Sequence, residues 1–178
     1  MTKGIIAGIA ICLMLALGGV ARGQDQLQAK ESAFKAAFLF RFIDYIDWKN
    51  NSESSTFNIA VLGNSEVTKQ LQIIAEDQKA KNKKMNVKAY ATLDDIDFCY
   101  ILFVPADCPS TIESIVSKYA GKPVLIVSEK EDYSKRGSHI NFTVADNKLK
   151  FEINLKKVDR SGIKISSQLL QHAIIIED

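Results

Sequence analysis

The sequence predicts an α/β domain: a mostly parallel sheet flanked by helices, a Rossmann-like αβα sandwich, with an antiparallel hairpin near the C-terminus. Two observations carry this prediction. Between residues 57 and 129, short apolar runs alternate with segments of helical periodicity, which is the pattern of a parallel sheet covered by helices. From residue 139 onward, apolar and polar side chains alternate strictly, as in antiparallel strands with one buried face.

The first 23 residues differ from the rest of the chain. A positive charge at Lys3 precedes an apolar run over residues 5–20, and small residues follow at Ala21 and Gly23. This order is typical of a secretory signal peptide, and the run is shorter than the ~20 residues of a membrane-spanning helix. We therefore predict a cleaved signal peptide over 1–23 and a single exported domain over 24–178.

Charge gives no reason to expect nucleic acid as a partner. The 23 Lys and Arg residues fall to 21 when Lys3 and Arg22 leave with the signal, which equals the 21 acidic residues. Nucleic-acid-binding domains usually carry a basic surface. The cluster "KAKNKK" (79–84) is the main basic stretch, and its composition predicts a solvated loop.

The first element of the mature chain is a predicted helix over 32–48, capped by Ser32, with an unusually wide apolar surface. At 100° per residue, its apolar arc spans about 220°, against the ~100° stripe of an ordinary surface helix. One face is aromatic and carries Phe34, Phe38, Phe42 and Tyr45, and a second is aliphatic and carries Leu39, Ile43 and Ile46. Lys35 interrupts the arc. Either both faces lie in the core, or one meets a partner chain.

Four strands and two helices are expected next along the chain. The strands are at 57–63, 85–92, 99–105 and 123–129, the first ended by Gly63. The helices are at 64–78, with Asn64 or Ser65 as N-cap, and at 109–121, with Pro109 in the first turn and Gly121 past the end. Residues 93–97 are expected to form a turn or a short helix.

The C-terminal region predicts a hairpin and then a short closing segment. The apolar positions of the hairpin are Ile140, Phe142, Val144, Leu149, Phe151 and Ile153, with "ADNK" (145–148) between the two runs. Residues 156–162 are expected to form a short helix or turn ended by Gly162. A short strand and a closing helix are expected after it.

The sequence does not contain the residue patterns of common catalytic or metal sites. Its two histidines, His139 and His172, stand outside any recognisable hydrolase motif, and the spacing of Cys and His does not suit a metal site. Gly63 alone does not make a dinucleotide fingerprint. We therefore predict no enzyme activity, no catalytic residues, no metal and no cofactor. Cys99 and Cys108 are not expected to form a bridge, because a strand from Cys99 would carry the chain away from it.

Two sets of polar or loop residues are worth testing for binding or chemistry. Open α/β sheets bind ligands at the carboxyl ends of their strands, which would form a pocket here. That pocket would involve Gly63, Asn64, Pro105 and Ser128. The polar residues to inspect first are Lys35, Glu152 and Asn154, and the latter pair is expected to face solvent on the hairpin.

Six segments carry a resemblance to a known family. They are "FKAAFLFRFIDYIDW", "FNIAVLGNS", "CYILFVP", "KPVLIVSE", "GSHINFTVADNKLKFEINL" and "SGIKISSQLLQHA". In this order the chain resembles the YfiR/HmsC-like periplasmic family over about residues 32–175. The resemblance implies a periplasmic, commonly dimeric regulator. Members bind the periplasmic domain of an inner-membrane diguanylate cyclase and hold it inactive; their release raises cyclic-di-GMP and favours biofilm. Sensor kinases are an alternative partner.

The resemblance also bears on particular residues. It favours a first helix with one face in the core, while Phe34, Phe38, Phe42 and Tyr45 contact a partner or a second copy. Cys99 resembles a family cysteine at a strand start, but no second cysteine lies upstream to bridge it. The expected function is regulation of a membrane signalling protein. The alternative is a periplasmic small-molecule sensor with its pocket at the strand carboxyl ends.

Overall fold

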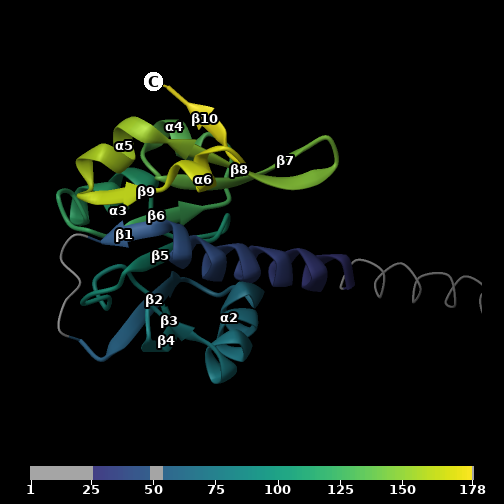
Figure 1. The fold of residues 1–178 in the computed structure, drawn as a ribbon, viewed down its shortest axis with the longest axis vertical. Helices are drawn as coiled ribbons and strands as arrows, with labels where there is room; N and C mark the ends of the chain where they lie inside the picture. The colour runs from purple at the N-terminus through teal and green to yellow at the C-terminus, as the bar shows by residue number, and fades with distance from the viewer. Residues whose placement is uncertain (1–25, 49–53, 178) are drawn as a thin grey trace, which may run out of the picture.

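The computed structural model describes residues 26–48 and 54–177, so the predicted signal peptide lies outside the described residues (Figure 1). Two sheets occur among them. The larger has eight strands in the order β10-β8-β7-β6-β5-β2-β4-β3. Its strands are β2 (Thr56–Leu62), β3 (Lys79–Ala80), β4 (Lys83–Tyr90), β5 (Ile101–Val104), β6 (Leu125–Ser128), β7 (Ile140–Ala145), β8 (Lys148–Asn154) and β10 (Ile174–Ile176). The smaller pairs β1 (Ile46–Trp48) with β9 (Ile163–Ile165), antiparallel.

The large sheet is mixed. Strands β4, β2, β5, β6 and β7 pair in parallel, whereas β3 joins β4 and β8 joins β7 in antiparallel pairs. The α/β class, the flanking helices and the C-terminal hairpin are confirmed. The mostly parallel sheet is corrected to a mixed one, because antiparallel partners close the parallel block at both ends. The Rossmann-like comparison stays a prediction.

Helices cover both faces of this sheet. The described helices are the N-terminal helix (26–45), α2 (Glu66–Asp77), α3 (Ile112–Lys118), α4 (Tyr133–Arg136), α5 (Leu155–Arg160) and α6 (Ser167–Leu170). Successive residues of β5 point into two different cores. Ile101 and Phe103 join the core beneath the N-terminal helix and α2, and Leu102 and Val104 join the core beneath α3 and α4. A strand buried on both faces explains the continuous apolar run in this part of the sequence.

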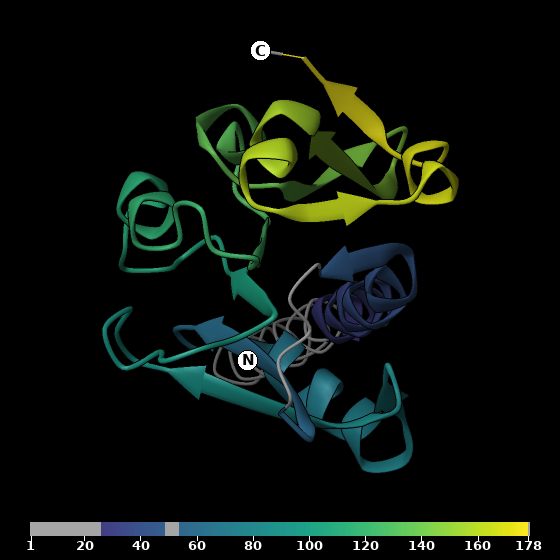
Figure 2. The ribbon, with the colours of Figure 1, turned by 60° about the vertical axis from the view of Figure 1, so that its left-hand side comes forward.

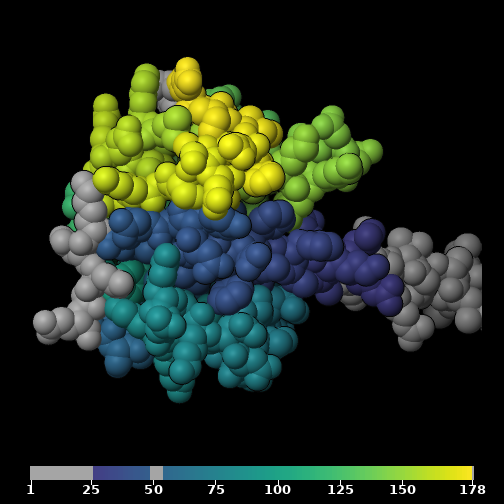
Figure 3. Space-filling model, in the orientation of Figure 1, coloured from purple at the N-terminus to yellow at the C-terminus, as the bar shows by residue number. Residues whose placement is uncertain are grey.

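The N-terminal helix lies along the middle of the molecule. In Figures 2 and 3 it passes between the C-terminal segments and the α2–β4 region. Its Phe42 ring packs against Phe142 and Phe151 of the hairpin, with centroids 6.0 and 5.1 Å away. Just past the helix, the Trp48 ring packs edge-on against Phe57, and its Nε1 donates to the Tyr100 carbonyl at 3.2 Å. The helix and the strand β1 that follows it therefore connect the hairpin and the parallel block through aromatic side chains.

Two features of the predicted first helix are wrong. Ser32 does not cap it, because helical backbone already extends from residue 26 across this position. The helix gives way to strand β1 at Ile46, so Trp48 is not helical. The pairing of β1 with β9 supplies backbone partners that favour an extended chain at this point.

The basic cluster at 79–84 is a tight hairpin, not a loop. Strands β3 and β4 are joined by Lys81 and Asn82, whose φ angles of 51° and 65° are left-handed. Two consecutive left-handed residues match the twist of a two-residue hairpin, and asparagine tolerates this conformation. The same geometry at Asp146 and Asn147, with φ of 54° and 56°, joins β7 to β8.

The remaining differences lie at element ends. Pro109 precedes α3, whose N-cap is Thr111. The predicted closing helix is only the single turn α6, after which the chain adds β10 in parallel to β8. His172 follows α6 in a turn and is exposed. The three isoleucines of β10 have the high strand propensity that favours this outcome.

The aromatic packing yields a test with a matched control on the same helix. Phe42 is 0% exposed and Phe34 is 61% exposed. We expect Phe42→Ala to lower the free energy of unfolding by about 3–5 kcal/mol, because it leaves a cavity in the core. Phe34→Ala should change it by less than about 0.5 kcal/mol. Urea unfolding followed by circular dichroism measures both, and equal effects would contradict the described position of the helix.

Candidate functional site

A partly buried ion pair joins the N-terminal helix to the carboxyl edge of the sheet. Lys35 Nζ lies 2.6 Å from Glu129 Oε2 and 2.5 Å from Glu31 Oε1. Glu129 follows directly after β6, and its other oxygen accepts the Ala106 N–H after β5 at 3.1 Å. One carboxylate therefore connects the helix, the end of β5 and the end of β6.

The charge of Lys35 is favoured in this setting. Burial by itself lowers the pKa of Lys35, but hydrogen bonds and charge from Glu129 and Glu31 outweigh it, so the pKa of Lys35 lies above its ordinary value. Lys35 is therefore a fixed positive charge at neutral pH. This accounts for the polar interruption of the helix's apolar arc.

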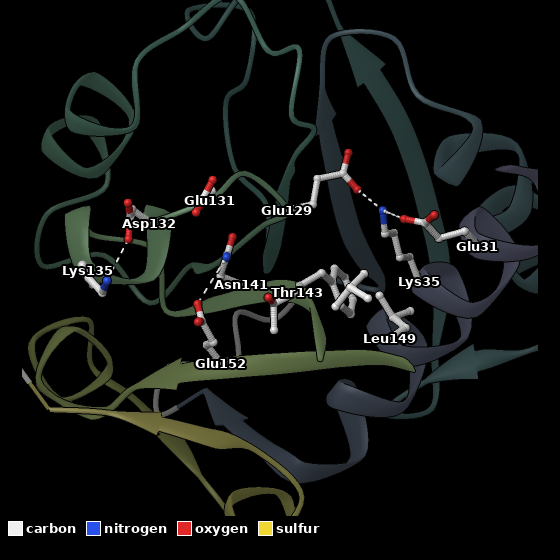
Figure 4. A pocket seen from close by; sticks show the side chains of 12 residues that line it. Glu31, Lys35, Glu129, Glu131, Asp132, Lys135, Asn141, Thr143, Leu149 and Glu152 are labelled. Atoms are coloured by element: carbon white, nitrogen blue, oxygen red, sulfur yellow. Dashed lines mark hydrogen bonds and ion pairs between the residues drawn. The ribbon is translucent and has the colours of Figure 1, made fainter. Parts of the chain in front are cut away.

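Two cavities flank this ion pair, and Glu31, Lys35 and Glu129 line both. The first cavity, of about 490 Å³, lies between the helix, the loop after β6 and the β7–β8 hairpin (Figure 4). Its other lining residues are Glu131, Asp132, Lys135, Asn141, Phe142, Thr143, Val144, Leu149 and Glu152. The stretch Glu129–Asp132 directly follows a strand, which is the sequence signal that could have identified its acidic rim.

The second cavity, of about 630 Å³, lies at the carboxyl ends of β2 and β5. Asn64 and Pro105, two of the four predicted pocket residues, line it. Gly63 and Ser128 are not among its lining residues. Ser128 is fully buried, and its hydroxyl donates to Asn141 Oδ1 at 2.6 Å. A ligand function of this pocket stays a prediction.

The two polar hairpin residues have different roles. Glu152 lines the first cavity, where its Oε2 accepts from Ser134 Oγ at 2.6 Å and from Asn141 Nδ2 at 3.3 Å. Asn154 is fully buried and caps α5, because its Oδ1 accepts the Lys157 N–H at 3.1 Å. Its Nδ2 donates to the Ser134 carbonyl at 2.9 Å. The expectation that Asn154 faces solvent is therefore wrong.

The four aromatic residues predicted to contact a partner differ in exposure. Phe42 has no exposed surface, so its assignment to a contact face is corrected: its ring belongs to the core of the monomer. Phe38 and Tyr45 are half-buried against the same core. Phe34 is the member with a largely exposed side chain. The helix therefore turns Phe42 into the core and Phe34 outward, and the contact role of Phe34 stays a prediction.

The remaining candidate groups support structural roles. Cys99 is buried, Cys108 is partly buried, and both are free thiols. Burial raises the pKa of Cys99 to about 12, which disfavours the reactive thiolate. His139 is buried, and its Nδ1 accepts the Ile126 N–H at 2.9 Å. Among the described residues, no group of three or more His, Cys, Asp or Glu side chains is placed to hold a metal ion.

This geometry defines a small α/β domain with charged cavities at the carboxyl edge of its sheet and with exposed apolar side chains, Leu27 and Phe34, on its N-terminal helix. The chain belongs to the YfiR/HmsC-like family, whose sequence model matches residues 32–174. This is a family of periplasmic regulators of diguanylate cyclases. The comparison with curated proteins found no match. None of the helices in the described segments has the length and hydropathy needed to cross a membrane.

Removal of the Lys35 charge tests the ion pair. We expect Lys35→Met to lower the free energy of unfolding by about 1–3 kcal/mol, because it leaves the mostly buried Glu129 carboxylate without its cation. Lys69→Met, which breaks an exposed pair with Glu66, should cost less than about 1 kcal/mol. The double variant Lys35→Met/Glu129→Gln should recover part of the loss in urea unfolding. No recovery would mean that Lys35 acts through packing alone.

His139 predicts a loss of stability in acid. Desolvation lowers the pKa of His139 from 6.5 to about 4, so the unfolded chain binds this proton at a higher pH than the folded one. The contribution of neutral His139 to the free energy of unfolding is complete above pH 6.5. It is lost as the pH falls towards 4, and the total loss is about 3 kcal/mol.

A matched pair of variants isolates this effect. In His139→Asn, the amide oxygen can still accept the Ile126 N–H but does not titrate, so urea unfolding should depend less on pH between 6.5 and 4. His172→Asn, at the exposed histidine, should keep the original dependence. Parallel pH profiles for the original protein and His139→Asn would show that His139 is not the titrating group.

Proposed function

We propose that this protein regulates an inner-membrane signalling protein, a diguanylate cyclase or a sensor kinase, by binding its periplasmic domain. The observation that carries the proposal is the extent of the family match, which covers residues 32–174 and so includes the helix, the sheet and the hairpin. A predicted signal peptide would bring the domain to the periplasm, where such a partner is accessible.

The exposed apolar side chains supply a contact surface for that partner. Leu27 and Phe34 on the N-terminal helix are 69% and 61% exposed, and Val144 near the hairpin tip is 66% exposed. The helix end and the hairpin project from the same side of the domain (Figure 1). Exposed apolar residues that gather on one side are typical of protein contacts. The contact, with the membrane partner or with a second copy in a homodimer, therefore centres on Phe34 and excludes Phe42.

A pull-down from detergent-solubilised membranes of the native organism, with residues 24–178 as bait, tests this function. We expect mass spectrometry to identify a cyclase or kinase that has a periplasmic domain. Phe34→Glu should reduce its recovery at least tenfold, because a charge replaces an apolar anchor. Ile73→Glu is the matched control, since Ile73 is 58% exposed on α2. Equal recovery of the partner with both variants would show that Phe34 and the N-terminal helix do not take part in the contact.

A small-molecule sensor is the second function we propose, and the cavity beside Asn64 and Pro105 favours it. It lies where open α/β sheets bind their ligands. A ligand there would contact Lys35 and Glu129 and so bias the position of the helix. Recovery of only the protein itself in the pull-down, at a concentration where it is folded, would favour this function over the regulator.

A further inference from the structure

A third cavity, of about 220 Å³, lies at the amino ends of β6 and β7, away from the carboxyl edge described above. The C-terminal ends of α3, α4 and α5 form its walls. Its lining residues are Val116, Tyr119, Ala120, Gly121, Ile126, Arg136, Gly137, His139, Lys157, Arg160 and Ser161. Neither the family match nor the predicted pocket residues assign a role to it.

A close approach of α3 and α4 at Gly137 forms one wall of this cavity. Gly137 ends α4 with φ of 142°, and a Cβ built there would lie 2.6 Å from Val116 Cγ2. Only glycine allows α3 and α4 to approach so closely while the chain turns into His139. This close approach places the apolar surface of α3 next to the polar groups of α4 and of the start of β7.

His139 supplies a buried donor at this cavity. The side chain is 6% exposed and lines the cavity. Because Nδ1 accepts the Ile126 N–H, the proton of the neutral ring is on Nε2. Within the described part of the chain, no hydrogen bond is found for Nε2–H, and it is not one of the fully buried unpaired atoms, so this donor opens to the cavity. A ligand with an acceptor atom would satisfy it.

The charged side chains in the described lining of the cavity are all basic. Arg136, Lys157 and Arg160 line it, and none of its described lining residues is acidic. Glu113 pairs with Arg136 at 2.9 and 3.1 Å on the exposed side, which holds that guanidinium at the rim. Val116, Tyr119 and Ile126 provide apolar walls. Basic residues in the last turns of α4 and α5 also stabilise these helices through the helix dipole. That role does not account for the unpaired donor of His139.

We propose that this cavity binds a small organic carboxylate. The acid group accepts hydrogen bonds from His139 Nε2–H and from the basic side chains of α4 and α5. The compact apolar body packs against Val116 and Tyr119. Arginine and lysine pair well with carboxylates, and the partly enclosed setting strengthens these bonds. Such a ligand would bind independently of the partner surface on the N-terminal helix.

Nitrogen NMR of the isotope-labelled mature protein, residues 24–178, tests the proposal. Acetate, hexanoate and benzoate are titrated in turn while the His139 ring nitrogens are observed. We expect at least one of them to shift the Nε2 resonance saturably. Benzyl alcohol and benzylamine, which have the same ring without a carboxylate, should not do so. No saturable shift with any of the three carboxylates, or an equal shift with benzyl alcohol, would overturn the proposal.

Variants locate the binding groups. Lys157→Gln and Arg160→Gln should each weaken the affinity at least fivefold and keep a well-dispersed spectrum, since Lys157 is only half-buried and Arg160 is exposed on α5. Lys88→Gln on β4, away from the cavity, is the control and should leave the affinity unchanged. An unchanged affinity in both α5 variants would also overturn the proposal.

Discussion

The contact of Phe42 with Phe142 and Phe151 connects the N-terminal helix to the β7–β8 hairpin, and the arrangement of the sheet depends on it. The hairpin is remote in sequence from the helix, and its apolar face needs a cover that α6, a single turn, is too short to provide. The N-terminal helix supplies that cover. The same helix continues into β1, whose pairing with β9 attaches the C-terminal segment a second time.

The polar edge of the domain follows from the same placement. A helix that lies across the sheet brings the partly buried Lys35 to the carboxyl ends of β5 and β6, where Glu129 holds it. The first and second cavities lie on either side of this ion pair, and both have charged lining residues. The N-terminal helix therefore carries both exposed apolar side chains and the central cation of the charged edge.

The order of apolar and polar residues predicted most of the fold, because most strands and helices of this domain have a buried side that their sequences show. The alternation from Ile140 to Ile153 defined the hairpin, and Ser65 does cap α2. Lys81 and Asn82 were misread because composition alone does not distinguish a solvated loop from a left-handed hairpin turn. Phe34 and Phe42 lie on one helical face, yet only tertiary packing decides which of them is covered. Asn64 and Pro105 were predictable from topology, whereas Glu31 reaches both cavities through contacts distant in sequence.

The outermost strands of the large sheet are very short, so each covers only part of its neighbour. Within the described part of the chain, β3 pairs with Lys83 and Lys84 of β4, and β10 pairs with residues 152–154 of β8. The rest of β4 and of β8 has no strand partner on that side among the described residues, and such an edge can accept an added strand. Lysines along both segments, Lys88 and Lys150 among them, oppose that pairing. Charge, and not a closed margin, therefore protects these edges.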